Sequence, residues 1–209
     1  MNWDKIEKIY TELASTHYPQ PEEPVGMGHS LAAQNAVDWL MKRIAVSSCV
    51  DMGCGEGFMQ PMFEKHGVSY TGLAFGQDVI NAQAKGRNVI ECDFNLPPAG
   101  LSAELLTSRH SLEHSLFPHI TLNIWREVAT KYIFLVLPAY EWVFSGIKGS
   151  NHFNVLTLDQ WKACFTHADL EIKDWLVTWR QGRPDIHAPN ERTQDEYWFL
   201  LQQRRDDGT

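Results

Sequence analysis

The feature that most constrains the fold of this chain is a run with glycine at every second position, Gly53, Gly55 and Gly57, after an apolar segment that ends near Asp51. The apolar segment indicates a buried strand, and a helical pattern begins at about Phe58. A strand that turns at once into a helix needs glycine in the turn, because glycine has no Cβ and reaches positive φ. Unsatisfied N–H groups at the start of the next helix favour a polar or anionic ligand. The run therefore predicts a ligand-binding loop.

The spacing of these glycines distinguishes two kinds of nucleotide site. A dinucleotide site prefers G-x-G-x-x-G, whereas here Phe58 stands where the last glycine of that pattern would fall. The D-x-G-x-G-x-G run resembles the first motif of the class I S-adenosylmethionine-dependent methyltransferases, and the resemblance extends over residues 45–203. It implies that S-adenosyl-L-methionine is the cofactor, bound by a loop that an acid orients, through Asp51, Gly53, Cys54, Gly55 and Gly57.

Composition limits the classes of function. The chain has 209 residues, 44% of them hydrophobic and 21% charged, which is ordinary for one soluble globular domain. Its net charge of −8 argues against a broad nucleic-acid surface, which is usually basic. Four cysteines without C-x-x-C spacing indicate reduced thiols, and no signal peptide or membrane span is expected. We therefore expect a cytoplasmic protein that does not contact a membrane.

Two regions are expected. Residues 1–44 predict an N-terminal helical segment, with a short amphipathic helix at 4–14, a proline-containing loop at 15–28 and a second helix at 30–43 that Ser30 could cap. This segment could be a lid over the cofactor or could simply pack at the edge of the core. Residues 45–209 predict the methyltransferase domain, so that the whole chain forms one globular unit.

From residue 47 onwards, short apolar runs alternate with helical patterns. The expected strands are 48–52, 68–74, 89–94, 105–109, 132–137, 170–179 and 196–203. The expected helices are 58–66, 77–85, 120–130 and 158–167. This alternation predicts an α/β fold, a Rossmann-like doubly wound sheet with helices on both faces. No helical pattern separates the last two strands, so a mostly parallel seven-stranded sheet with an antiparallel last strand is expected, as in the resembled family.

The second expected strand departs from the resembled family at its end. Such methyltransferases usually end this strand with Asp or Glu, whose carboxylate binds both ribose hydroxyls, but here the position falls on Ala74. Alanine cannot accept a hydrogen bond through its side chain. We therefore expect either that Gln77 or Asp78, in the next helix, takes part of this role, or that the cofactor binds weakly. The resemblance also places Phe75 against the adenine.

The next two expected strands also end in candidate cofactor-binding residues. The resemblance implies that Asp93 accepts a hydrogen bond from the adenine amine and that Phe94 packs on the ring. The alternative for Asp93 is a solvent-facing loop acid. The resemblance further places Ser108 and Arg109 along the methionine portion of the cofactor.

The segment after Arg109 allows two interpretations. His110, Glu113 and His114 match the H-x-x-E-H pattern of inverted zinc peptidases, in which two histidines on a helix share a metal. That site needs a helical setting and a third ligand, whereas this segment begins at the end of an apolar strand. The resemblance instead places His110 at the methyl-transfer site, as the first candidate for a general base, and we expect no metal.

A long connection at 139–156 follows the fifth strand. Loops of this length at the carboxyl edge of a sheet are usually functional or mobile. Its aromatic residues, among them Tyr140 and Trp142, could line an acceptor pocket or seal a core or an interface. His152, which the resemblance places before the next helix, is the second candidate for a general base.

These features predict methyl transfer from S-adenosylmethionine to an unidentified acceptor, by default a small molecule. An alternative, motivated by Ala74, is a protein that binds S-adenosylmethionine without transferring its methyl group, as a regulatory or partner subunit. A third alternative is a zinc hydrolase that uses His110, Glu113 and His114. Nucleic acid is not the expected acceptor, because the chain is acidic and lacks an Asn-Pro-Pro-Tyr signature. The sequence predicts no particular oligomeric state.

Overall fold

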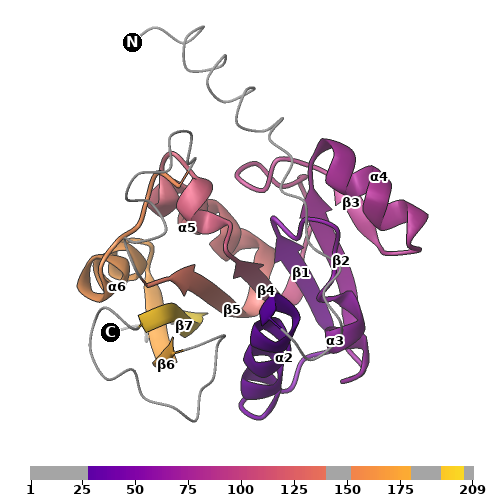
Figure 1. Ribbon diagram of the computed structural model, residues 1–209. Coiled ribbons are helices and arrows are strands. Elements are labelled where there is room, and N and C mark those ends of the chain that lie inside the picture. The colour runs from indigo at the N-terminus through magenta and orange to yellow at the C-terminus, as the bar shows by residue number, and fades with distance from the viewer. Residues whose placement is uncertain (1–27, 140–151, 180–193, 205–209) are drawn as a thin grey trace, which may run out of the picture.

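The computed structural model describes residues 28–139, 152–179 and 194–204 of this chain (Figure 1). The expected helix at 4–14 and the loop at 15–27 lie outside these ranges, as do Tyr140 and Trp142. The possible lid is therefore described only from its second helix onwards. That helix, α2 (Gly28–Met41), begins two residues before the expected cap at Ser30.

Seven strands form one sheet in the order β3-β2-β1-β4-β5-β7-β6 (Figure 1). Neighbours from β3 to β5 pair in parallel, whereas β7 pairs antiparallel with both β5 and β6. The expected fold class is confirmed, including the antiparallel last strand. The strands are β1 (Ser48–Met52), β2 (Ser69–Ala74), β3 (Val89–Glu91), β4 (Ala103–Arg109), β5 (Ala129–Pro138), β6 (Leu170–Trp179) and β7 (Gln194–Gln203).

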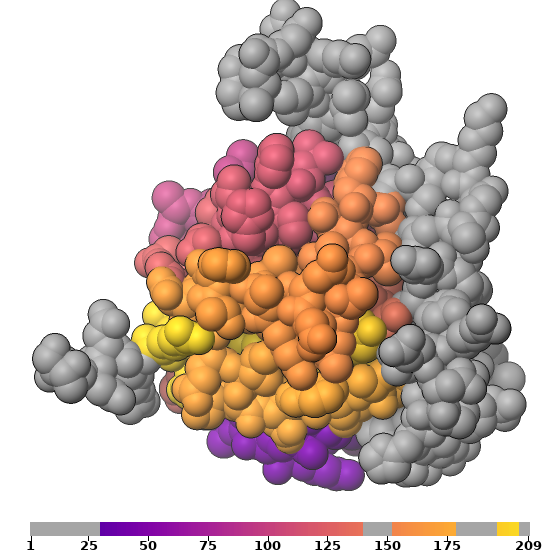
Figure 2. Space-filling view, turned by 90° about the vertical axis from the view of Figure 1, so that its left-hand side faces the viewer, coloured from indigo at the N-terminus to yellow at the C-terminus, as the bar shows by residue number. Residues whose placement is uncertain are grey.

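Helices cover both faces of the sheet, because strand residues alternate between two hydrophobic cores. Phe134 of β5 packs with one set of helices, and its neighbours Ile133 and Leu135 pack with the other. The first core contains residues of α2, α3 (Gln60–Glu64) and α4 (Gly76–Ala84). The second contains residues of α5 (Pro118–Val128), α6 (Leu158–His167) and the 3₁₀ turn η1 (Leu112–His114). Figure 2 shows the molecule from the side of α6 and the edge strand β6.

Several element boundaries differ from the sequence prediction by one to three residues, and two of these differences have local physical reasons. The third strand was expected to reach Phe94 but ends at Glu91, because Asp93 Oδ1 accepts hydrogen bonds from the backbone and side-chain nitrogens of Asn95 in a turn. The helix expected at 58–66 is shorter, because the glycine loop continues as turns up to Met59 before α3 begins. Among the described residues, no helix combines the length and apolar character that crossing a membrane requires.

Candidate functional site

The glycine loop after β1 lies at the carboxyl edge of the sheet, where the ends of the parallel strands meet. All three glycines have positive φ, with values of 73°, 54° and 68° for Gly53, Gly55 and Gly57. A Cβ placed on Gly53 would lie 2.4 Å from Ser111 Oγ and 3.4 Å from Phe94 Cδ1. Glycine is therefore required there both by the backbone angle and by close packing of two other loops.

Side chains from β4 and from the segment after it support this loop. Ser108 Oγ donates a hydrogen bond to the carbonyl of Met52 at 3.0 Å, and Ser111 Oγ donates to the carbonyl of Gly53 at 2.9 Å. The backbone N–H of Cys54 donates to the carbonyl of Leu73 in β2. The glycine loop is thus joined by hydrogen bonds to β2, to β4 and to the segment after β4.

Glu56 anchors the far end of the loop, and sequence reasoning missed it. Its buried carboxylate accepts hydrogen bonds from Asn81 Nδ2 at 2.8 Å and from Lys85 Nζ at 2.7 Å, and Arg87 binds its carbonyl. Burial raises the pKa of Glu56, but the bonds from Lys85 and Asn81 outweigh this effect and lower it. Glu56 therefore ties the glycine loop to α4 and to the segment before β3.

Asp51 lies buried beneath the loop, at the carboxyl end of β1. Its Oδ2 accepts a hydrogen bond of 2.7 Å from the hydroxyl of Tyr70 in β2. Burial raises the pKa of Asp51 to about 7, against the opposing effects of the Tyr70 hydroxyl and the Arg109 charge. Asp51 thus lies at the end of β1 and binds the Tyr70 hydroxyl, while its role toward the cofactor stays a prediction.

The end of β2 lacks an acidic residue, as expected from the sequence, because Ala74 is buried there and has no polar side chain. Phe75 follows as the N-cap residue of α4 and is partly exposed. The amide nitrogen of Gln77 donates along the helix to Asn81 Oδ1 at 2.8 Å. Glu91, which pairs in register with Ala74 on the neighbouring strand, accepts a hydrogen bond of 3.3 Å from the N–H of Gly76. A carboxylate therefore lies beside the position from which the acid is missing.

Phe94 is held in place by α5. The indole nitrogen of Trp125 donates to the Phe94 carbonyl at 2.6 Å, and the two rings meet edge to face with centroids 6.0 Å apart. Asp93 stands directly before it and bonds within its own loop to Asn95. Asp93 thus stabilises its own loop through Asn95, and both a role toward adenine and that of a solvent-facing loop acid stay predictions.

A buried ion network lies at the end of β4. Glu196 Oε1 accepts hydrogen bonds from Arg109 Nη2 at 2.8 Å and lies 2.7 Å from His110 Nε2, while Trp198 Nε1 donates to Oε2 at 2.9 Å. Burial raises the pKa of Glu196, but the Arg109 guanidinium and the His110 imidazole hold it well below its usual range. Sequence reasoning named Arg109 and His110 but missed Glu196, which is 86 residues from His110.

His110 lies between two carboxylates. Its other ring nitrogen, Nδ1, is 3.6 Å from Glu113 Oε1. Burial and the Arg109 charge lower the pKa of His110, but Glu113 and Glu196 outweigh them and raise it. The residue also has a φ of 52°, which is uncommon for a side chain other than glycine. Glu113 and Glu196 therefore stabilise the protonated form of His110 and fix the orientation of its ring.

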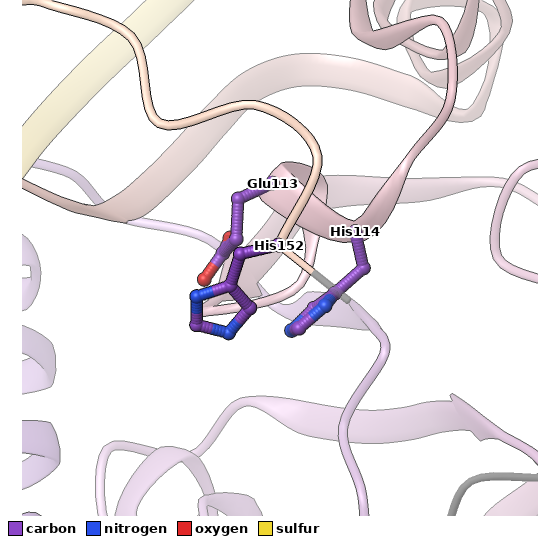
Figure 3. A group of neighbouring side chains, drawn as sticks. All are labelled: Glu113, His114 and His152. Atoms are coloured by element: carbon purple, nitrogen blue, oxygen red, sulfur yellow. The ribbon is translucent and has the colours of Figure 1, made fainter. Parts of the chain in front are cut away.

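Glu113, His114 and His152 form a second cluster beside His110 (Figure 3). Glu113 is fully buried in η1, and the rings of His114 and His152 meet edge to face with centroids 4.3 Å apart. Burial, with a smaller effect of His114, lowers the pKa of His152 to about 4. Because η1 is one 3₁₀ turn, His110 and His114 do not lie on an α-helix, the setting that the zinc-hydrolase alternative requires.

No family model and no curated protein sequence matches this chain. Solved structures do match it. A methyltransferase from Clostridium acetobutylicum ATCC 824 that depends on S-adenosylmethionine superposes with a TM-score of 0.65 over 97% of this chain and 99% of that chain, at 9% identity. The chain has the fold of the class I S-adenosylmethionine-dependent methyltransferases. Within this methyltransferase fold, the magnesium protoporphyrin IX methyltransferase of Synechocystis PCC 6803, solved with bound S-adenosylhomocysteine, has a TM-score of 0.62 over 96% of this chain and 95% of that chain, at 12% identity.

The same fold also occurs in a protein that is named as a cyclase and not as a methyltransferase. The [4+2]-cyclase SpnF superposes with a TM-score of 0.62 over 96% of this chain and 94% of that chain, at 15% identity. Identities in this range establish the fold but not the reaction. The reaction must therefore be argued from the residues of the site itself.

Proposed function

We propose that this chain binds S-adenosylmethionine at the carboxyl edge of β1 to β4 and transfers its methyl group to a small-molecule acceptor. The observation that carries this proposal is the glycine loop, which has positive φ at Gly53, Gly55 and Gly57 and packs against Ser111 and Phe94. Such a loop exposes backbone N–H groups and lets a ligand approach closely. Bound there, the cofactor would supply an activated methyl group.

The residues of this chain would bind and orient the two reactants. The glycine loop and Cys54 would hold the methionine portion, together with Ser108 and Arg109. Phe75 and Phe94 would bracket the adenine, because both stand in loops at the carboxyl edge. Placing the reactants in line and excluding water would provide most of the rate enhancement.

A general base is needed only if the acceptor loses a proton. His110 has both ring nitrogens directed at carboxylates and a raised pKa, so it keeps its proton to a higher pH than an ordinary histidine. His152, with a pKa of about 4, is uncharged at neutral pH and has a lone pair that could accept a proton. We therefore propose that His110 orients the acceptor and that His152, whose imidazole is neutral near pH 7, is the candidate of the two for accepting a proton.

A second candidate function is binding of S-adenosylmethionine without methyl transfer. The missing acid at Ala74 motivates it, because the buried alanine side chain offers no acceptor to the ribose hydroxyls of the cofactor. A [4+2]-cyclase has a similar fold, so this fold is not restricted to proteins named as methyltransferases. The acidic net charge argues against nucleic acid as a partner in both cases.

Calorimetric titration of the purified chain with S-adenosylhomocysteine tests both candidates. Binding with one equivalent per chain is expected, and its absence would refute both. Incubation with S-adenosylmethionine labelled in the methyl group and a panel of hydroxyl, amine and thiol acceptors then separates them. Label in an acceptor supports the enzyme, whereas binding without transfer to any acceptor supports the second candidate. Full turnover by both His110→Ala and His152→Ala would remove the acid–base roles.

A further inference from the structure

Three side chains able to ligate a metal converge beside the candidate site from two separate segments of the chain. Glu113 and His114 belong to η1, and His152 stands before α6. One ligand atom from each lies within 4.8 Å of the other two. Figure 3 shows the Glu113 carboxylate and both imidazole rings directed into the same space.

The backbone holds His152 against η1. The N–H groups of Phe153 and Asn154 both donate to the carbonyl oxygen of Glu113, at 2.9 and 3.0 Å. The side-chain amide of Asn154 also donates to the carbonyl of Ser115. These three bonds join two segments that are about 40 residues apart in sequence and fix the residue after His152. These hydrogen bonds therefore hold His152 next to His114.

Glu113 gives an independent indication of a bound cation. Its side chain is fully buried, and neither carboxylate oxygen has a hydrogen-bond donor among the described residues. Its nearest charged neighbour is His110, whose Nδ1 at 3.6 Å makes an ion pair too long for a hydrogen bond. A buried carboxylate without donors is costly, and a metal ion is one of the few partners that relieves this cost.

We propose that Glu113, His114 and His152 bind one divalent transition-metal ion. Two imidazoles and one carboxylate are a common three-ligand set for zinc and for similar metals, and this set leaves coordination positions open. A water molecule can fill an open position. An oxygen atom of the methyl acceptor can also fill it, which would make the acceptor an oxygen compound; this last point alone rests on the proposed function.

Two simpler arrangements compete with a metal. In the first, the three side chains only pack, and His110 balances the charge of Glu113. In the second, the His152 lone pair accepts a proton from the acceptor. A metal on His152 would exclude this role, so the two assignments of His152 are alternatives. A metal titration distinguishes the metal site from both arrangements. Only the metal site predicts that one metal ion binds per chain and that binding depends on His114 and His152.

The test uses the full-length protein, freed of metal with a chelator and titrated with Zn²⁺ by calorimetry and with Co²⁺ by visible absorption. One equivalent of Zn²⁺ per chain is expected, together with a Co²⁺ spectrum typical of a low-coordinate site with nitrogen and oxygen ligands. Because loss of an outer partner of a metal ligand already weakens binding about 10–100-fold, His114→Ala and His152→Ala should each weaken it at least about 100-fold. The matched control is His119→Ala, since His119 is exposed on α5 and outside the cluster. It should bind Zn²⁺ like the wild type.

Absence of stoichiometric binding of both metals by the wild type would overturn the proposal, as would wild-type affinity in His152→Ala. His152 is only partly buried, so this variant is expected to fold even if a change at Glu113 is not tolerated; circular dichroism checks this. A parallel titration with S-adenosylhomocysteine keeps the two proposals apart. Zn²⁺ binding without S-adenosylhomocysteine binding would uphold the metal site and refute the proposed function, and the reverse result would do the opposite.

Discussion

Glu196 Oε1 lies 2.7 Å from Nε2 of His110, although 86 residues separate the two in sequence. The direction of β7 explains this contact. Because β7 runs antiparallel to β5, its first residues reach the edge at which the parallel strands end, and Glu196 pairs there with Pro138. The one strand of opposite direction thus adds a buried carboxylate to the candidate site at the carboxyl edge.

Substitution Glu196→Gln should destabilise the protein by about 3 kcal/mol at neutral pH, because it leaves the buried Arg109 guanidinium without its counter-charge. The pKa of Glu196 is lowered in the folded state, so its contribution is complete above the ordinary carboxyl pKa and decreases as the pH falls below it. The difference between wild type and variant should therefore shrink in acid. Urea unfolding at several pH values measures it.

The control for this prediction is Glu127→Gln, since the Glu127 side chain is 75% exposed on α5. Exposed substitutions usually change stability by less than about 0.5 kcal/mol. Equal losses in the two variants would contradict a special role for the Glu196 network.

Asp51 should make stability fall as the pH rises. Its pKa is raised to about 7 in the folded state, so the folded protein holds this proton where the unfolded chain has released it. The wild type should therefore lose up to about 4 kcal/mol between pH 4 and pH 8, relative to Asp51→Asn, which does not titrate. Urea unfolding of both proteins over this range tests the sign.

A second variant sharpens the Asp51 prediction. The Tyr70 hydroxyl lowers the pKa of Asp51 through its 2.7 Å hydrogen bond, so in Tyr70→Phe the loss of stability should continue to a higher pH. Parallel stability curves for wild type and Asp51→Asn between pH 5 and pH 8 would show that the carboxyl ionises normally in the folded protein.

Gly53→Ala should abolish binding of S-adenosylhomocysteine and destabilise the fold by about 2–3 kcal/mol. The new Cβ would meet Ser111 Oγ at 2.4 Å, in addition to the strain of a φ of 73°. Gly67→Ala is the matched control, because Gly67 has a φ of 74° but no heavy atom within 4 Å of a Cβ. It should lose about 1 kcal/mol and keep its affinity. Similar affinities of the two variants for S-adenosylhomocysteine would show that the glycine loop does not bind this ligand.

The sequence predicted well what depends on local pattern and poorly what depends on distant partners. The first and last residues of β1 and α6 were predicted correctly, because the spacing of apolar residues and the turn residues beside them mark these ends. The glycine loop could also be predicted, because positions with positive φ favour glycine and the glycines are evident in the sequence. By contrast, Glu56 and Glu196 are ordinary acids in the sequence, and their roles arise from side chains 25 to 87 residues away. A period within one strand does not specify which side chains meet across the sheet.

The structure also changes which residue is the best candidate to bind the ribose of the cofactor. Gln77, named from its place after Ala74, has its amide nitrogen bound to Asn81, whereas Glu91 places a carboxylate oxygen 3.3 Å from the N–H of Gly76. Glu91 is exposed and stands level with Ala74 on the next strand, so it can offer charged acceptors to a hydroxyl at this edge.

We therefore expect Glu91→Gln to weaken binding of S-adenosylhomocysteine about tenfold, the loss typical of replacing a charged hydrogen-bond acceptor by a neutral one. Gln77→Ala should weaken it less than about threefold. Calorimetric titration measures both, and adenine alone serves as a control ligand because it has no ribose. If Gln77→Ala causes the larger loss, the ribose is bound from α4, as the position of Gln77 in the sequence first suggested. A loss of adenine affinity equal to the loss of S-adenosylhomocysteine affinity in Glu91→Gln would instead place the effect of Glu91 on the base, because only the complete ligand carries the hydroxyls that a carboxylate would bind.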